Sequence, residues 1–568
     1  MTNAEIALML NEFADLMELR GDVFKRNAYR RAARGVEALE KDISQVIEEG
    51  RLESIPGVGK SIALKIREMA DTGRSKELEG LRSSLPSGLS DIMRVPEVGP
   101  RTAARLYSEL GVTSLGELKR AAEEHRIRKL AGFGERSEEN ILKGIAMVER
   151  LGRRMLLSDA LLKGEAIAEH VRASGIALVS VAGSMRRMRE TVGDVDVLVG
   201  TDRPEEAMSA LVSFPQVVGI IVRGNRKTSV RLSDGTQADM RAVPASSYGA
   251  ALQYFTGSKE HNVRLRRIAM QKGLKLNEYG LFEEDGNDLA AGRPEEDIYR
   301  LLGLQPVPPE LREDRGEIGA AAEGRLPRLV EMSDIRGDLH VHTVMSDGHG
   351  TMRDMAMAAK RLGYEYVGMT DHSASLHVAH GLSAEELLDS VEQARQLTEE
   401  LGFPVLRGAE MDILEDGALD YPNDVLDQLD YVIGSVHSRF KMSADEMTDR
   451  VIRAIRSGRL HILGHPTGRL LGRREEYSID LDAVMEEAKR HRVALEVNGF
   501  PDRLDLNDVN CRKAKERGVM TVLNTDSHRE ANLANMRLAV GTARRGWLEP
   551  ENVLNCLPYE LLKASLDR

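Results

Sequence analysis

Seven short apolar segments recur between residues 338 and 528, and each ends in polar residues of the types that bind metal ions. The segments are 338–342, 366–372, 404–410, 431–437, 461–465, 494–498 and 521–528. Sequence with helical periodicity, such as 354–362 and 384–401, separates them. This alternation predicts βα units that close into a barrel of seven parallel strands, with the strand ends gathered at one mouth.

The residues at these strand ends favour a metal site. His340 and His342 occupy alternate positions of one strand, so both imidazoles project from the same face. Further histidines and carboxylates follow in the motifs Ser346-Asp-Gly348, Thr370-Asp-His372, Glu410, His437, Gly464-His-Pro466 and Thr525-Asp-Ser-His528. Mixed imidazole and carboxylate ligands suit Zn²⁺, Mn²⁺ or Fe. The alternative, a set of unrelated buried polar residues, requires each one to find a separate partner.

Charge divides the chain into two chemically different parts. The net charge of −12 arises from about +1 over residues 1–300 and about −13 over residues 301–568. Eleven of the 14 histidines lie at or after His340. The first part is near neutral with basic clusters, whereas the acidic second part suits cation binding. Residues 305–335, with four prolines and many charges, predict a linker.

Length and composition exclude several classes of protein. A chain of 568 residues suggests three or four domains, and a hydrophobic content of 42% is too high for a disordered chain. No apolar run is long enough to span a membrane, and the acidic N-terminus does not resemble a signal peptide. Cys511 and Cys556 are too few for a disulfide scaffold, so we expect a cytoplasmic protein.

Three similar turns, at 55–60, 95–100 and 130–135, each lie between helical segments. Their glycines are Gly57, Gly59, Gly99, Gly132 and Gly134, while the second turn has Glu97 at its first glycine position. Glycine permits a positive φ and leaves N–H groups open to a phosphate oxygen. Three copies favour helix-hairpin-helix DNA-binding motifs over turns that only reverse the chain. A basic cluster at 25–34, including Lys25 beside Tyr29, is a second candidate DNA contact; a solvated helix face is its alternative.

A carboxylate constellation marks the α/β region at 150–245. Asp194 and Asp196 lie two positions apart on a predicted strand, which puts both carboxylates on one face, and Asp239 lies on a second strand. The alternating valines, Val195, Val197 and Val199, face a core. Such a triad can hold two Mg²⁺ ions between a triphosphate and an attacking hydroxyl. Gly183 and Ser184 suit a phosphate, and Arg187 can neutralise pyrophosphate. The alternative for Asp-Val-Asp alone is a surface strand.

The motif spanning 183–196 resembles the nucleotidyltransferase motif of the family X DNA polymerases, typified by DNA polymerase beta. Residues 254–258 resemble that family's nucleotide-selecting turn, in which an aromatic pair disfavours a ribose 2′-OH. The resemblance implies a set of nucleotide contacts: Gly183, Ser184, Arg187, Gly193, Tyr254, Phe255, Gly257, Ser258, Asn262 and Arg266. Val263 replaces the family's template-contacting lysine, and Gln237 replaces an arginine that tunes the third carboxylate.

The first 82 residues resemble the lyase domain of the same family. The resemblance covers 24–32 and 55–66, which includes Lys60, and it places Lys65 at the position of the Schiff-base lysine. It therefore implies 5′-deoxyribose-phosphate lyase activity. A lysine nucleophile must lose its proton, and we expect basic neighbours such as Lys25 to lower the pKa of Lys65.

Residues 336–568 resemble the PHP (polymerase and histidinol phosphatase) domain, a distorted (β/α)7 barrel. Matching its motifs implies nine ligands for a three-metal cluster: His340, His342, Asp347, His372, Glu410, His437, His465, Asp526 and His528. All nine are residues that can bind metal, so the pattern indicates an active phosphoesterase.

Both resemblances in this order are typical of bacterial family X DNA polymerases that carry a PHP domain. We expect the following domains: lyase-like with helix-hairpin-helix (1–82), helix-hairpin-helix (83–148), palm (149–245), nucleotide-selection subdomain (246–304), linker (305–335) and PHP (336–568). The expected function is gap-filling synthesis with Mg²⁺ or Mn²⁺, and 3′–5′ exonuclease or 3′-end processing by the PHP domain. Gapped DNA and dNTPs are the expected partners of a monomer associated with the nucleoid. The alternatives are a fused small-molecule phosphatase and a DNA-gap-binding scaffold with weak catalysis.

Overall fold

The computed structural model describes residues 3–19, 22–37, 39, 43–72, 75–83, 88–93, 95–96, 98–152 and 154–567. They form two compact units. The first comprises residues 1–152 with 472–474, and the second comprises the rest of the chain. Within the described residues, no helix combines the length and apolar character needed to cross a membrane.

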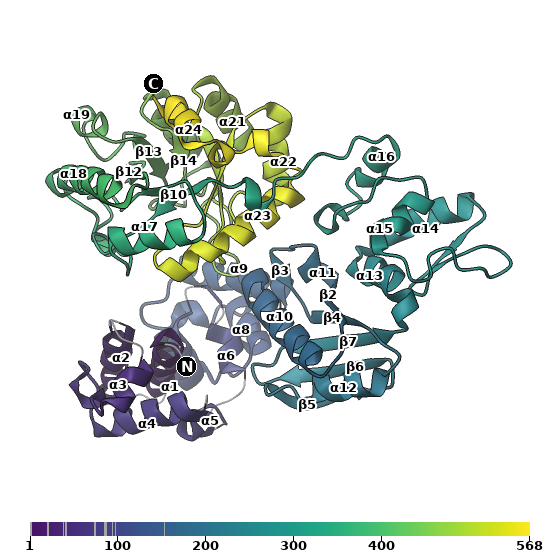
Figure 1. Ribbon diagram of the computed structural model, residues 1–568. Helices are drawn as coiled ribbons and strands as arrows, with labels where there is room; N and C mark the ends of the chain where they lie inside the picture. The colour runs from purple at the N-terminus through teal and green to yellow at the C-terminus, as the bar shows by residue number, and fades with distance from the viewer. Residues whose placement is uncertain are drawn as a thin grey trace. The chain divides into compact units, whose positions relative to one another are not determined.

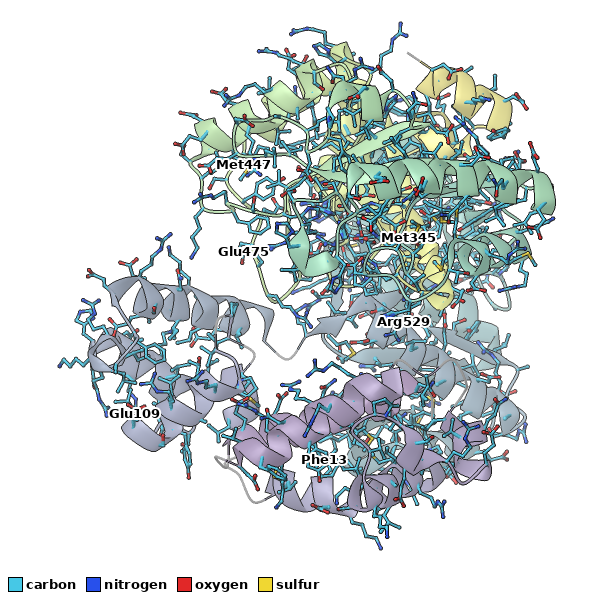
Figure 2. All side chains as sticks on the ribbon, turned by 90° about the vertical axis from the view of Figure 1, so that its left-hand side faces the viewer. Phe13, Glu109, Met345, Met447, Glu475 and Arg529 are labelled. Atoms are coloured by element: carbon cyan, nitrogen blue, oxygen red, sulfur yellow. The ribbon has the colours of Figure 1, made fainter. Side chains whose placement is uncertain are left out.

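The first unit is helical and has two hydrophobic cores. The first core is built by α1 (Asn3–Leu19), α2 (Val23–Glu37), α3 (Ile43–Glu48), η1 (Leu52–Ser54), α4 (Lys60–Thr72) and α5 (Lys76–Ser83). The second is built by α6 (Leu89–Met93), α7 (Pro100–Leu110), α8 (Leu115–Glu123), η2 (Ile127–Lys129) and α9 (Glu135–Leu151). Phe13 lies on α1 among the side chains of the first bundle (Figure 2), and its ring stacks on Tyr29 at 4.8 Å.

The palm of the second unit is a five-stranded sheet. Its strand order is β2 (Leu178–Val181), β4 (Val195–Gly200), β7 (Gln237–Val243), β6 (Lys227–Leu232) and β5 (Val217–Arg223). Helices α10 (Leu157–Ala173) and α12 (Pro204–Val212) cover one face and share a core with the predicted inward valines. α13 (Tyr248–Thr256) packs against Leu198 on the other side of β4. The short α11 (Gly183–Arg186) and β3 (Thr191–Val192), which pairs with β1 (Met155–Leu156), connect β2 to β4.

A smaller subdomain follows the palm and includes part of the predicted linker. Its elements are α14 (Lys259–Gln271), β8 (Lys275–Leu276), β9 (Leu281–Phe282), α15 (Glu295–Leu301), η4 (Pro309–Leu311) and α16 (Glu317–Ala322). The structure differs here from the expectation of a linker over 305–335, because Leu311, Ile318 and Ala321 are buried in the core of this subdomain. Arg312 is also buried and pairs with Glu295 at 3.2 Å.

The seven predicted strands of the C-terminal region are all present in one parallel sheet. They follow chain order: β10 (Gly337–Val341), β11 (Tyr366–Met369), β12 (Val405–Asp412), β13 (Tyr431–Ser435), β14 (Ile462–Leu463), β15 (Ala494–Asn498) and β16 (Thr521–Asn524). A parallel bridge between Val341 and Ser527 joins the two outer strands and nearly closes the barrel. Every strand residue is buried, as expected where helices enclose a parallel sheet.

Helices enclose these strands (Figure 1). They are α17 (Met352–Arg361), α18 (Ala384–Leu401), α19 (Asn423–Leu426), α20 (Ala444–Arg456), α21 (Leu481–Arg490), α22 (Asp508–Arg517), α23 (Met536–Arg545) and α24 (Tyr559–Leu566). Three of them begin at a capping box, in which a hydroxyl and a carboxylate three residues later satisfy each other's backbone N–H groups. The pairs are Thr351 with Asp354, Ser383 with Glu386, and Ser443 with Glu446.

The barrel and the palm share apolar contacts within the second unit. Leu504, after β15, and Leu538, on α23, belong to the hydrophobic core of the palm. Gly541 of α23 lies against Met188, because a Cβ at Gly541 would come within 2.4 Å of the Met188 Cε. The palm and the barrel are therefore parts of one packed body.

Candidate active sites

The palm brings together two of the three predicted carboxylates by strand register. Asp196 on β4 is directly opposite Asp239 on the parallel strand β7. Asp194 immediately precedes β4, rather than lying on the strand as expected. Gly183 packs against the same site, since a Cβ there would meet Asp196 Oδ2 at 2.1 Å. Glycine is required at this position because any side chain would displace the carboxylate.

The electrostatics of Asp196 suit a role in binding a cation. Burial, together with the nearby charges of Asp194 and Asp239, raises the pKa of Asp196 to about 7. A carboxylate is costly in such surroundings unless a cation compensates it. The residues present therefore suit divalent metal binding, as the sequence predicts.

Asp239 is held by donors that replace the family arginine. Gln237 Nε2 donates to Asp239 Oδ1 at 2.9 Å, and Lys227 Nζ lies 3.1 Å from Oδ2. Burial alone would raise the pKa of Asp239, but hydrogen bonds from Gln237, Ser229 and Lys227 lower it. Sequence analysis missed Lys227, because only the antiparallel pairing of β6 with β7 brings it beside Asp239.

Contacts around the turn at 254–258 connect several of the predicted nucleotide-contacting residues. Arg186 donates to Thr256 Oγ1, and Arg187 donates to the Thr256 carbonyl. Ser258 caps α14 by accepting from the His261 amide. Tyr254 and Phe255 meet edge to face at 5.1 Å, and Arg241 lies over the Phe255 ring. Gly183 and Ser184 lie on α11 just before Arg187, and Gly257 lies in the turn, whereas Gly193 lies between β3 and β4 and Arg266 is half-buried on α14.

The Asn262 side chain makes two hydrogen bonds within the protein. Its Nδ2 donates to the Tyr254 carbonyl at 2.7 Å, and its Oδ1 accepts from Gln253 at 2.8 Å. The side chain is buried, so both polar groups are satisfied inside the protein. Asn262 therefore fastens the aromatic turn to α14.

Lys65 departs from the electrostatic expectation. Its ammonium lies 3.0 Å from Glu77 Oε2 and donates to Ser61 Oγ at 3.0 Å. Burial would lower the pKa of Lys65, but Glu77 and Tyr29 raise it overall. The expected lowering by Lys25 is thus wrong, because the nearest partners of Lys65 are acceptors; Lys25 itself pairs with Asp22 at 3.4 Å.

The basic cluster on α2 is partly neutralised by α1. Arg26 pairs with Glu18 at 2.8 Å, and Arg30 pairs with Asp15. Tyr29 is a core residue whose ring packs on Phe13, so its aromatic face is not open to DNA.

The three glycine turns share one backbone geometry. In each, an amide donates three residues back: Val58 to Ile55, Val98 to Val95 and Phe133 to Leu130, at 2.9–3.0 Å. Gly57 and Gly132 have φ values of 86° and 82°, which explains glycine there, and Glu97 lies outside the described residues. Gly59, Gly99 and Gly134 immediately precede α4, α7 and α9, where no atom lies close enough to contact an added Cβ. Lys60, the first residue of α4, is exposed.

The mouth of the barrel gathers the nine predicted ligands. Eight of them fall into three overlapping groups whose ligand atoms lie within 4.8 Å of one another. The groups are His342, Asp347, His372 and His528; His340, His342 and Asp526; and His372, Glu410 and His437. The ninth, His465, contacts Glu410 Oε1 through Nε2 at 2.9 Å.

The hydrogen bonding of these imidazoles indicates metal coordination. Several buried nitrogens have no hydrogen-bond partner among the described residues: His340 Nε2, both nitrogens of His342 and His437, His372 Nδ1 and His465 Nδ1. A buried imidazole nitrogen without a partner is costly in a folded protein. His372 Nδ1 lies 3.0 Å from Glu410 Oε2, but the pair lacks hydrogen-bond geometry. Lone pairs that converge beside carboxylates suit bound cations.

Electrostatics in the barrel mouth separate the histidines into two groups. Burial, with nearby cationic groups, lowers the pKa of His342 and of His465 to about 4. Burial opposes protonation of His437 and His528 as well, but adjacent carboxylates raise the pKa of each to about 9. His342 and His465 therefore present neutral imidazoles near neutral pH, the form that binds metal.

Two residues that sequence analysis missed surround the ligands. Glu496, buried on β15, lies 2.7 Å from His340 Nδ1 and orients that ring. Arg503 Nε lies 3.1 Å from Asp526 Oδ2 and brings a cation to the site. A glutamate within an otherwise apolar strand was the available signal for Glu496. Arg503 lies in a loop and carried no such signal.

The two sites define a chain that combines a DNA polymerase beta-like palm with a PHP-like barrel whose mouth gathers residues able to bind metal ions. Family profiles agree: a helix-hairpin-helix domain matches 1–75, a SAM-like helix-hairpin-helix tandem 89–146, a DNA polymerase beta thumb 251–313 and a PHP domain 338–499. The DNA polymerase/3′-5′ exonuclease PolX of Bacillus subtilis is 39% identical and aligns over 100% of both chains. Probable phosphatases of Shewanella oneidensis and Escherichia coli are each 30% identical over 40% of this chain, covering 89% and 91% of their own lengths.

The chain therefore belongs to the PolX family of bacterial DNA polymerase/3′-5′ exonucleases. This confirms the sequence-based assignment to bacterial family X with a C-terminal PHP domain, and it confirms that the chain is an enzyme.

Asp196→Asn should stabilise the metal-free protein while abolishing its synthesis activity. The unfolded carboxyl ionises near pH 4, whereas the folded one keeps its proton to about pH 7. Native stability therefore falls as the pH rises through this range, by up to roughly 4 kcal/mol above pH 7. In EDTA we expect a higher melting temperature for the variant at pH 8 and little difference at pH 4.

Circular-dichroism melts at both pH values test this expectation. Asp202→Asn is the matched control, because Asp202 is an exposed aspartate just beyond β4. Equal melting temperatures of Asp196→Asn and wild type at pH 8 would show that the ionised Asp196 carboxylate does not destabilise the folded protein.

Proposed function

We propose that the palm fills short gaps in DNA during repair, and that the barrel removes or trims the 3′ end. The observation that carries the polymerase half is the pairing of Asp196 with Asp239 across β4 and β7, with the pKa of Asp196 raised to about 7. The cluster of unpartnered imidazole nitrogens supports the second half.

The proposed metal ligands are Asp194, Asp196 and Asp239 for Mg²⁺ or Mn²⁺, and the nine barrel residues for three ions of Zn²⁺, Mn²⁺ or Fe. When bound, such ions supply Lewis acidity to phosphate oxygens and to water. Lys227 and Gln237 keep Asp239 ionised and oriented. Glu496 orients His340, and the Arg503 guanidinium offers a donor to a phosphate oxygen.

Substrate binding in this proposal uses residues on both units. Gly183, Ser184 and Arg187 contact the triphosphate, and Tyr254 with Phe255 crowds a ribose 2′-OH. The N–H groups in the first turns of α4, α7 and α9, which follow Gly59, Gly99 and Gly134, contact the DNA backbone without reading its sequence. The enzyme acts as a monomer on gapped DNA and dNTPs in the bacterial cytoplasm, at the nucleoid.

A small-molecule phosphatase is the second candidate for the barrel. The resemblance of this region to probable phosphatases favours it. Hydrolysis of p-nitrophenyl phosphate without digestion of DNA 3′ ends would select this alternative. Digestion of a 5′-labelled primer in the same metal buffer supports the exonuclease.

The two chemistries should be separable by single substitutions. Asp239→Asn keeps the side-chain size but removes a metal-binding charge, so primer extension should fall by at least ~10²-fold while 3′–5′ digestion persists. His342→Ala should have the reverse effect, because it removes an imidazole shared by two ligand groups. A gel of gapped DNA with and without dNTPs reports both activities.

Because metal binding also contributes folding free energy, each variant needs a matched thermal melt. Loss of digestion in Asp239→Asn, or loss of synthesis in a stably folded His342→Ala, contradicts the two-site proposal.

Lys65 should form the Schiff base of a weak lyase activity. Glu77 stabilises the ammonium form, so Glu77→Gln should increase borohydride trapping on an incised abasic site at pH 7.5, and wild-type trapping should rise with pH. Lys65→Ala should abolish trapping. Undiminished trapping in Lys65→Ala would assign the nucleophile elsewhere.

A further inference from the structure

Glu313 is a mostly buried carboxylate that binds three arginines from two different domains. Its Oε1 accepts from Arg187 Nε at 3.0 Å and from Arg545 at 3.0 Å, and its Oε2 lies 3.4 Å from Arg189. Arg187 and Arg189 belong to the palm loop after β2, whereas Arg545 is the last residue of the barrel helix α23. One carboxylate therefore joins the barrel to the loop proposed to bind triphosphate.

Arg545 also holds the backbone of that loop. Its Nη1 donates to the Arg187 carbonyl at 2.8 Å, and its Nη2 contacts Asp508 at 2.7 Å. The side chain is only 5% exposed, so these contacts are shielded from solvent. The same guanidinium thus fixes both the main chain of Arg187 and the partner of its side chain.

The network leaves positive charge on the palm side. Four guanidiniums, those of Arg187, Arg189, Arg315 and Arg545, surround two carboxylates, Glu313 and Asp508. Arg187 uses Nε for Glu313 and Nη1 for the Thr256 carbonyl. Among the described residues no acceptor binds its Nη2, which leaves a donor for an anionic ligand.

We propose that Arg545, a residue of the PHP barrel, is a positioning residue for nucleotide binding by the polymerase. The inference rests on the proposed contact between Arg187 and the triphosphate. Arg545 hydrogen-bonds the loop backbone. Its guanidinium also neutralises part of the negative charge of Glu313, so that Glu313 neutralises Arg187 less completely. Without it, the loop loses an anchor and Glu313 neutralises Arg187 more fully, and both effects weaken triphosphate binding.

The neighbouring Arg544 provides a matched control. It lies on the same helix and pairs with Glu310 at 2.8 Å, three residues before Glu313. Its Nη1 also donates to the Val330 carbonyl, so Arg544 joins α23 to the same segment, and among the described residues its side chain has no hydrogen bond or ion pair with the palm loop. If α23 only supported the structure in general, substitution of either arginine would change nucleotide binding. If Arg545 positions the palm loop, only its substitution does so.

The test compares Arg545→Met and Arg544→Met in single-nucleotide gap filling by the full chain. For Arg545→Met we expect the KM for dNTP to rise about tenfold with kcat changed less than about twofold, as for a lost binding contact. Arg544→Met should keep wild-type values, and both should retain 3′–5′ digestion. An unchanged KM in Arg545→Met, or an equal rise in Arg544→Met, overturns the proposal.

A double-mutant cycle tests whether Arg545 acts through Arg187. If it does, the rise in KM for Arg187→Met with Arg545→Met should be smaller than the product of the two separate rises. Additive effects overturn the proposal. If Arg545→Met fails to fold, the KM of Arg545→Lys tests the proposal instead. A single ammonium cannot replace all the contacts of the guanidinium group. We expect this KM to rise at least about threefold, and a wild-type KM overturns the proposal.

Hydrogen exchange separates this inference from the polymerase assignment. Amides of residues 183–192 should exchange faster in Arg545→Met than in wild type or Arg544→Met. An inactive wild-type palm would refute the proposed function, while the exchange rates would still report whether Arg545 holds the loop. Equal exchange in all three proteins overturns the positioning role.

Discussion

Glu410 is a fully buried carboxylate in contact with histidines from four strands of the barrel. Its oxygens lie 2.9–3.3 Å from His340, His372, His437 and His465. A buried charge of this kind is tolerated only when it is paired or bound to a cation. The barrel meets this requirement through its strand order. Only strand ends that converge at one mouth can bring histidines so far apart in the chain around one carboxylate.

The palm solves the same electrostatic problem with fewer groups. Asp196 and Asp239 lie directly opposite each other on neighbouring strands. Fewer neutralising partners surround these two carboxylates than surround Glu410. Lys227 and Gln237 stabilise the ionised form of Asp239, whereas Asp196 has an elevated pKa. Local rigidity therefore comes from the sheet in the palm and from a dense ligand network in the barrel.

Sequence periodicity predicted the seven barrel strands, and the resemblance to the PHP domain supplied nine candidate ligands, which the structure places together at the strand ends. It could not predict Arg503, whose contact with Asp526 depends on the loop after β15. It also placed Tyr29 on a DNA-binding face, since the stacking partner Phe13 lies on another helix. The prolines and charges at 305–335 indicated a linker, although Ile318 is buried. Its burial depends on packing against the preceding helices, which the local sequence does not show.

The loop after β15 contains neighbouring residues that contact the barrel site and the palm core. Arg503 contacts Asp526, a proposed metal ligand, while the next residue, Leu504, is buried in the palm core. Arg469 donates to the carbonyls of both residues and pairs with Glu190 of the palm at 2.8 Å. The Arg469 guanidinium therefore joins Glu190 of the palm to the backbone of Arg503 and Leu504 in the barrel. The ligand chemistry of each site is separate, but the backbone that supports them is continuous and packed as one body.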